Sequence, residues 1–461
     1  MRDRVLTWDV PGPVDGEVAF ASLFADARDA FWLDTGGVAD GASYLGAAAW
    51  SITAEEIREA GFDVFSWLQA ERGRWTVDVS DAPAGFALGL VGWLGYEIYA
   101  DTLGIRASYP RRHPDAAFMM VERALAIDHA TGQARLLAKG AAWDGELAAW
   151  RDDVIATLER LAAADGAEPS DVEASSDLEV EWRYSDAEYL RMVRACKHLI
   201  ADGDAYVLCL TTEATVDGEF DAWKVYRRLR RDSPSHHGAF LKTGDLALLS
   251  ASPEQFLEVS RGGRVTTKPI KGTRPRGGTE DEDRALAEEL RADAKERAEN
   301  VMIVDLMRND LNRVCEVGTV EVAKLLDVET YAPVHQLVST VTGQLAPGKD
   351  AVDAIRSCFP AGSMTGAPKH SAVTILRSLE HRSRGVYSGA FGYLGFDGAV
   401  DLAMTIRSIV IDAHGAAIGT GGGITALSEP EEELAETRLK AAALVRALAA
   451  SSSAGASSRD T

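Results

Sequence analysis

Two glutamates in separate helical stretches have the chemistry to share a divalent cation. Apolar residues follow Glu299 at three-, four- and seven-residue steps, which puts its carboxylate at the edge of an apolar helix face. Glu436 lies two turns into the last expected helix, behind an acidic run. Mg²⁺ usually takes one or two protein carboxylates and completes its shell with substrate and water. The pair therefore either holds Mg²⁺ or consists of solvated helix acids, Glu436 complementing the helix dipole.

Cations are the second chemical signal. The segment TKPIKGTRPRGG concentrates Lys268, Lys271, Arg274 and Arg276 in an acidic chain. It is either a solvated basic loop or a wall for a small anionic substrate. In the second case one lysine could be a nucleophile, provided that burial or neighbouring cations lower its pKa. Arg407, expected within a strand over 401–412, either lies on a solvated face or lines a cavity where it grips a carboxylate.

Glycine-rich segments allow some binding functions and exclude others. The run GTGGGIT (419–425) either forms simple turns or presents backbone N–H groups to a carboxylate. It does not fit the strand–GxGxxG–helix fingerprint of dinucleotide sites. The segment GSMTGAPK (362–369) has Ala-Pro where a P-loop needs Gly-Lys-Ser, which excludes that kind of ATP site.

These residues need a scaffold of helices and strands. Apolar periodicity predicts helices over 281–310, 367–380 and 430–450. The stretches 388–396 and 401–412 are rich in β-branched and aromatic residues and end at Asp-Gly or His-Gly turns. Short turns between strands favour antiparallel sheets flanked by helices, so we expect an α+β fold.

Composition divides the 461-residue chain and limits its function. We expect an N-terminal region over 1–165, an acidic linker or loop over 166–181, a second domain over 182–450 and a disordered tail over 451–461.

Forty-eight basic and 71 acidic residues leave a net charge of −23, which argues against nucleic-acid binding. The longest uncharged run, 84–96, is too short to cross a membrane, and the N-terminus lacks a signal-peptide core. Four scattered cysteines without a CxxC pair favour a reducing, cytoplasmic location over a disulfide framework or zinc site.

In their order along the chain, several segments resemble the chorismate-utilising enzymes, a family that contains anthranilate, aminodeoxychorismate, isochorismate and salicylate synthases. The matching segments are SASPEQF, PIKGTRPRG, ENVMIVDLMRNDL, HQLVSTVTG, FPAGSMTGAPK, YSGAFGYLGF, TIRSIV, GTGGGIT and ETRLKA. They span about 250–441, and LDTGGVADGASYLG and GWLGYE extend the similarity toward the N-terminus. The resemblance implies a sandwich-like core of antiparallel sheets with helices outside, and chorismate as substrate.

The resemblance also implies roles for individual residues. The Mg²⁺ carboxylates would be Glu299 and Glu436. Substrate binding would fall to Thr273, Thr365, Tyr387, Arg407, Gly421, Gly422, Gly423 and Lys440. His335 matches a histidine near the ring, and Glu254 matches the general acid that protonates the leaving hydroxyl. A carboxylic acid beside a bound dianion keeps its proton longer than a free one.

One residue bears on the subtype. Anthranilate- and isochorismate-forming members usually have a small residue in place of Lys271, whereas PIKGT is similar to aminodeoxychorismate synthase component I, on the route to p-aminobenzoate and folate. There the lysine attacks C2 as the C4 hydroxyl leaves, and ammonia then enters at C4 and expels the lysine. Anthranilate synthase component I is the alternative.

The resemblance further implies a partner. Ammonia would come from a glutamine amidotransferase subunit, because no cysteine here lies in a G-x-C-x-G elbow. Val207 replaces a usually polar residue, which is a water-activating lysine in isochorismate and salicylate synthases, and so argues against those activities. The tryptophan-binding motif of feedback-inhibited anthranilate synthases is reduced to FWLD (31–34), so tryptophan regulation is not expected.

Overall fold

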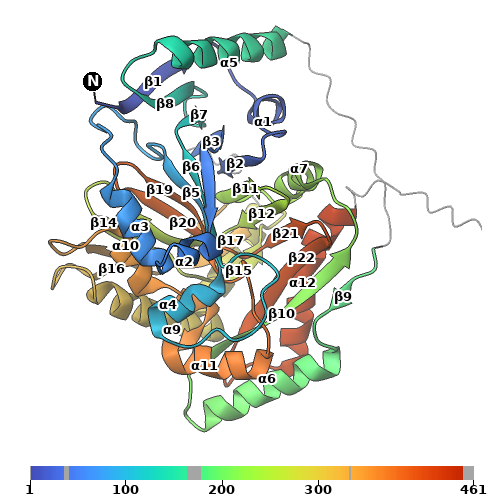
Figure 1. Ribbon diagram of the computed structural model, residues 1–461. Coiled ribbons are helices and arrows are strands. Elements are labelled where there is room, and N and C mark those ends of the chain that lie inside the picture. The colour runs from blue at the N-terminus through green and yellow to red at the C-terminus, as the bar shows by residue number, and fades with distance from the viewer. Residues whose placement is uncertain (1, 36–40, 164–177, 332–333, 450–461) are drawn as a thin grey trace, which may run out of the picture.

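The computed structural model describes residues 2–35, 41–163, 178–331 and 334–449, and its strands form two large antiparallel sheets (Figure 1). The first sheet contains, in spatial order, β1 (Arg4–Val10), β8 (Ala134–Gly140), β7 (Arg123–Asp128), β3 (Ala42–Ala47), β2 (Asp29–Asp34), β11 (His237–Thr243), β12 (Leu246–Ser252), β21 (Ser408–Asp412), β22 (Gly415–Ile424), β10 (Val207–Asp217) and β18 (Gly366–Ala367), with β9 (Glu181–Trp182) paired to β10. The second contains β15 (Ile270–Pro275), β17 (Val334–Gln344), β14 (Arg264–Thr267), β13 (Gln255–Val259), β20 (Val400–Met404), β19 (Ala390–Gly395), β5 (Gly89–Leu94), β6 (Ala116–Val121) and β4 (Trp50–Thr53), with β16 (Glu321–Thr330) paired to β17.

The two sheets pack face to face, as side-chain alternation along β11 shows. Ala239 and Leu241 face a cluster shared with Trp93 of β5 in the other sheet, whereas Phe240 points to the opposite face, beside Phe20 of α1 (Gly16–Leu23). Each sheet therefore has one face on its partner sheet and one face under helices. This four-layer arrangement confirms the expected α+β sandwich.

Helices cover both outer faces. The first sheet packs against α1, α5 (Gly145–Ala163), α7 (Ala222–Asp232) and α12 (Pro430–Ala449). The second packs against α2 (Ala54–Glu59), α3 (Val64–Gly73), α9 (Ala294–Asn312) and α10 (Ala351–Cys358). At the end of the molecule opposite α5, α6 (Asp186–Ala201) and α11 (Lys369–Glu380) pack on β10 (Figure 1). Shorter elements complete the chain: η1 (Tyr96–Ile98), α4 (Tyr99–Leu103), α8 (Glu280–Ala292) and η2 (Gly362–Met364).

Two stretches differ in detail from the expected elements. The helical region expected over 281–310 is present but divided at Asp293, whose carboxylate accepts the backbone N–H groups of Lys295 and Glu296 and so caps a second helix, α9. Arg407 does not lie inside a strand, because β20 ends at Met404 in the second sheet and β21 begins at Ser408 in the first. Arg407 therefore lies in the crossing between sheets, with a left-handed backbone (φ 51°).

Strands from before residue 165 and from after residue 182 pair within both sheets, for example β2 with β11 and β5 with β19. The boundary placed between these parts stays a prediction. Most of the acidic segment over 166–181 and the tail over 451–461 lie outside the described residues. All four cysteines are buried and unpaired. In the part of the chain that the structure describes, no helix has both the length and the apolarity needed to span a bilayer.

Candidate active site

One cavity of about 560 Å³ collects most of the predicted site residues. Its lining includes Glu254, Lys271, Thr273, Glu299, Tyr387, Arg407, Gly421, Gly422, Gly423, Glu436 and Lys440. They come from β13's N-terminal side, β15, α9, the 386–388 loop, the sheet crossing, β22 and α12. Sites more than 180 residues apart in sequence are therefore brought together by the two sheets and the helices beside them.

The helix α9 carries Glu299 into the cavity, and the next residue fixes the helix in place. The Asn300 side-chain amide donates to the backbone carbonyls of Pro269 and Leu337, both at 3.3 Å, and its oxygen accepts the hydroxyl of Ser339 at 2.5 Å. Pro269 directly precedes β15, so these bonds set the distance between Glu299 and the strand that bears Lys271.

A bulge in β15 sets the direction of the Lys271 side chain. The pairing of β15 with β17 shifts register between Lys271 and Thr273, and the residue between them, Gly272, has φ +75°. A side chain there would be strained, and its Cβ would also lie 2.7 Å from Leu290 Cδ1. Bulges of this kind redirect neighbouring side chains. The glycine of KGT is therefore required for the position of the lysine.

The glycine run is a strand, and its glycines make room for acids. Gly421, Gly422 and Gly423 lie in extended β22, paired with β10, so these glycines do not form a turn. A Cβ on Gly422 would lie 3.0 Å from Glu433 Oε2, and one on Gly423 would lie 3.3 Å from Glu299 Oε2. Because these glycines have no side chain, carboxylates from α9 and α12 can both approach β22.

Burial gives Glu299 an unusual carboxyl group. It is 6% exposed and makes no hydrogen bond or ion pair within the described residues. Burial raises its pKa to about 7, although the nearby Lys271 ammonium opposes the shift. A buried carboxylate without a partner is stabilised by an added cation, so Glu299 fits a metal ligand.

The second predicted metal ligand, Glu436, lies one helical turn before Lys440 on α12, and Glu436 Oε1 is 2.8 Å from Lys440 Nζ. Burial alone would raise the pKa of Glu436, but the Lys440 ammonium brings it below its usual value. Lys440 also donates to the carbonyl of Gly421 at 2.9 Å. Glu436 is thus held ionised at the cavity wall.

The described residues contain no cluster of three or more His, Cys, Asp or Glu side chains arranged as a complete metal cage. A Mg²⁺ site needs fewer protein ligands than that, because substrate and water complete the shell of this ion. By ligand type, Glu299 and Glu436 fit that ion.

Lys271 lies among carboxylates rather than cations. Burial lowers its pKa, but Glu299 and Glu254 outweigh burial and leave the pKa above its usual value. The condition set above for a nucleophilic lysine, a lowered pKa, is therefore not met in the protein without a ligand. Most of the other basic groups of this segment are already paired: Arg274 with Glu289 and Asp293, and Arg276 with Asp283. The Lys271 ammonium makes no hydrogen bond within the described residues and remains available to a ligand.

Glu254 is the acid next to this lysine. It is 6% exposed, and burial raises its pKa, while the nearby Lys271 ammonium lowers it. The Ser363 hydroxyl and the Ile270 backbone N–H lie near this carboxylate and also lower its pKa. A proton passed from Lys271 to Glu254 would create a free amine and a protonated carboxylic acid together, with no change in total charge.

The opposite wall can bind an anion. Arg407 lines the cavity, and its guanidinium makes no ion pair or hydrogen bond within the described part of the chain. Tyr387 lies beside it, buried, with its ring against Gly419, where a Cβ would lie only 2.0 Å from the ring carbon Cγ. The guanidinium is therefore free to take a carboxylate through two parallel hydrogen bonds.

Two predicted residues do not line the cavity. His335 is buried, with its ring nitrogens 2.8 Å from Thr330 Oγ1 and from Asp283 Oδ1. Its neighbour Gln336 lines the cavity instead, because successive residues of a strand point to opposite faces. The hydroxyl of Thr365 bonds to the carbonyls of Ala361 and Gly362, so it holds the turn that presents Ser363.

Several lining residues were missed from sequence. Lys295, Glu296 and Glu433 lie in the cavity, with Lys295 Nζ 3.0 Å from Glu433 Oε1. Both α9 and α12 contain the pattern E-x-x-E, which puts Glu296 on the same helix face as Glu299, and Glu433 on the same face as Glu436. That repeated spacing was the signal that could have identified Glu296 and Glu433. Cys209 and Ser363 carried no comparable signal.

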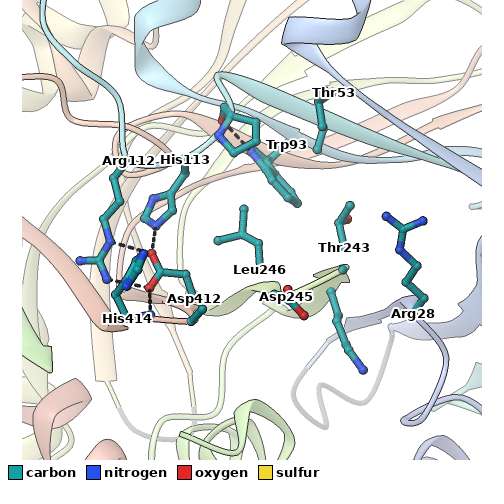
Figure 2. Close-up of a pocket in the computed structure, with 15 residues that line it drawn as sticks. Arg28, Thr53, Trp93, Arg112, His113, Thr243, Asp245, Leu246, Asp412 and His414 are labelled. Atoms are coloured by element: carbon teal, nitrogen blue, oxygen red, sulfur yellow. Dashed lines mark hydrogen bonds and ion pairs between the residues drawn. The ribbon is translucent and has the colours of Figure 1, made fainter. Parts of the chain in front are cut away.

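A second cavity, of about 680 Å³, holds none of the predicted residues. Figure 2 shows Arg112, His113 and His414 gathered around Asp412 on one side, with Leu246 in the middle and Trp93 behind. Asp412 Oδ2 accepts a hydrogen bond from Arg112 Nε and lies 3.0 Å from His113 Nε2, and Oδ1 accepts a hydrogen bond from Arg112 Nη2. The predicted site residues that line a cavity therefore line the first one and not this one.

Residues 30–446 match the model of the chorismate binding enzyme family. The chain belongs to the chorismate-binding enzymes. This assignment agrees with a cavity that has an unpaired guanidinium and carboxylates for a cation, since chorismate is a dicarboxylate. The resemblance found in the sequence is confirmed.

Named relatives include two subtypes of chorismate-binding enzyme. Aminodeoxychorismate synthase of Streptomyces griseus is 42% identical over 97% of this chain, and that of Arabidopsis thaliana is 38% identical over 86%. The chain spans 64% and 44% of the lengths of these relatives. Anthranilate synthase component 1 of Mycobacterium tuberculosis is 39% identical over 78% of this chain and 73% of its own. Among solved structures, anthranilate synthase component I of Streptococcus pneumoniae has a TM-score of 0.73 at 28% identity, covering 96% of this chain and 92% of its own.

We expect Gly423→Ala to weaken the response to Mg²⁺. Its Cβ would crowd Glu299 Oε2 at 3.3 Å, so the carboxylate must shift from its present position. The Mg²⁺ concentration for half-maximal turnover should rise about tenfold, or ~1.4 kcal/mol. Gly73→Ala is the control, because nothing lies within 4 Å of its Cβ position. An unchanged Mg²⁺ response in Gly423→Ala would contradict the proximity argument.

Proposed function

We propose that this chain is an aminodeoxychorismate synthase component I, a transferase that uses Mg²⁺ and ammonia to convert chorismate into 4-amino-4-deoxychorismate, the precursor of p-aminobenzoate and folate. The observation that carries the proposal is the placement of Lys271 between Glu254 and Glu299 in the cavity with Arg407. A primary amine beside a buried acid is the pair that covalent displacement of a hydroxyl needs.

The residues divide the work as follows. Arg407 binds one carboxylate of chorismate, and Glu299 and Glu436 hold the metal. When bound, Mg²⁺ would neutralise the ring carboxylate and withdraw electron density from the ring. Lys271 passes a proton to Glu254 and attacks C2 with its free amine. The double bond shifts, the C4–O bond breaks, and Glu254 returns the proton to the hydroxyl, which leaves as water.

The second displacement returns nitrogen to C4. Ammonia attacks C4, the double bond shifts back, and the C2–N bond to Lys271 breaks. The lysine amine is restored, and the ring keeps one new C4–N bond. Val207, buried next to Gly423, provides no base to activate water, which favours amination over hydration.

We further propose that ammonia is supplied by a glutamine amidotransferase subunit and that the enzyme is cytoplasmic. All four cysteines are buried. Burial raises the pKa of Cys196 to about 12 and of Cys315 to about 11, which leaves these two as poor nucleophiles for glutamine hydrolysis. Ammonium salts should replace the partner in vitro.

The product distinguishes this proposal from anthranilate synthase, which is favoured by the 39% identical mycobacterial relative. Purified chain is given chorismate, Mg²⁺ and ammonium. We expect a product that gives p-aminobenzoate only after aminodeoxychorismate lyase is added. Fluorescent anthranilate with release of pyruvate, in the absence of lyase, would show that the alternative is correct.

A further inference from the structure

Arg384 makes a buried set of hydrogen bonds that the proposed chemistry does not use. It lies between α11 and β19 and is 4% exposed. Its Nε and Nη2 donate to the two oxygens of Glu380 at 2.9 and 2.7 Å. Nη1 donates to the carbonyl of Met364 at 2.7 Å, and Nη2 to the carbonyl of Cys209 at 2.8 Å. One guanidinium thus joins three separate segments.

The bonded segments are walls of the cavity. Met364 and Cys209 both line it, and Met364 follows Ser363, which lines the cavity near Glu254. Glu380 Oε1 accepts the N–H and the hydroxyl of Thr211, at 3.0 and 2.9 Å. Thr211 pairs with Gly421 across the sheet. A shift of Arg384 would therefore move both the general-acid side and the glycine strand.

The N-terminal half of the chain supports Arg384 from behind. Glu97, in the segment GWLGYE, is 4% exposed and accepts the backbone N–H groups of Arg384 at 2.8 Å and of Gly385 at 2.9 Å. The ring of Tyr96 lies 4.2 Å from the guanidinium carbon. These contacts give GWLGYE a function: it holds the loop that carries Arg384.

We propose that Arg384, supported by Glu97, is a positioning residue that keeps Glu254, β10 and the 362–365 turn in register for catalysis. Charge alone is insufficient for this role. Only a planar group with several donors reaches Glu380 and both carbonyls at once, whereas lysine has a single ammonium. A measurement of chorismate turnover rests on the proposed function. A measurement of amide hydrogen exchange does not, because it reports on the structure alone.

The test compares Arg384→Lys with wild type in chorismate consumption with Mg²⁺ and ammonium. We expect kcat/KM to fall by between about tenfold and hundredfold, mostly in kcat, because small misplacements of reacting groups are costly and Arg407 still binds the substrate. Amide hydrogen exchange should become faster in peptides covering 207–211 and 362–366. Thr211→Val, which removes one hydrogen bond to Glu380, should lower kcat about threefold. If Arg384→Lys does not fold, this variant tests the positioning role in its place.

Arg230→Lys is the matched control. Arg230 also binds a buried carboxylate, with Nε 2.5 Å from Asp34 Oδ2, and also lies over an aromatic ring, Trp32. Its effect should be confined to thermal stability. The proposal is overturned if folded Arg384→Lys, or Thr211→Val in its place, keeps wild-type kcat and wild-type exchange in both peptides. A wild type that consumes no chorismate would instead refute the proposed function, and faster exchange in the variant would still support positioning.

Discussion

Lys271→Ala should lower amination of chorismate by at least about a thousandfold, because loss of a covalent nucleophile removes the route through which both displacements pass. Binding of chorismate should persist, since Arg407 and the proposed metal ligands Glu299 and Glu436 remain. Turnover is measured as p-aminobenzoate formed in the presence of the lyase, and binding is measured by calorimetry with Mg²⁺ present.

Lys268→Ala is the control for this experiment. Lys268 belongs to the same basic segment but does not line the cavity. It should keep wild-type turnover within about twofold, as most surface substitutions do. Turnover by Lys271→Ala within tenfold of wild type would exclude the covalent route.

Glu299→Gln should lower turnover by about a hundredfold to a thousandfold, the usual effect of losing a group that stabilises charge in the transition state. The amide keeps the shape of the side chain but loses the negative charge that a divalent cation needs. It also removes a carboxylate that raises the pKa of Lys271. Excess Mg²⁺ should restore part of the activity if the defect is in metal binding.

Asp305→Asn is the control that tests whether loss of a negative charge matters at Glu299 in particular or anywhere on this helix. Asp305 lies on the same helix but is exposed, and among the described residues it pairs only with Arg308. Its amide variant should behave as wild type, because surface ion pairs contribute little. Equal Mg²⁺ responses in Glu299→Gln and wild type would show that Glu299 is not a metal ligand.

The sequence predicted the composition of the site better than its geometry. Glu254, Lys271, Glu299, Arg407 and Glu436 were all named from motifs, and all line one cavity. The residue order of a motif identifies which side chains are present, and the sandwich brings them together.

What could not be predicted depends on tertiary contacts. The bulge at Gly272 and the alternation of β17 decide that Gln336, and not His335, faces the cavity. Arg407 looked like a strand residue because β-branched neighbours surround it, but the chain changes sheets there. The raised pKa of Lys271 comes from acids on other elements, which a local basic segment does not reveal.

The most direct test of the account is intact-mass analysis of the enzyme with chorismate and Mg²⁺ but no ammonia. Attack at C2 with loss of the C4 hydroxyl should leave an adduct with the mass of chorismate less one water, and peptide mapping should place it on Lys271. The same treatment of Lys271→Ala should give unmodified protein. An adduct that persists in Lys271→Ala, or wild type that turns over chorismate with ammonium yet never acquires the adduct without it, would contradict a lysine-bound intermediate.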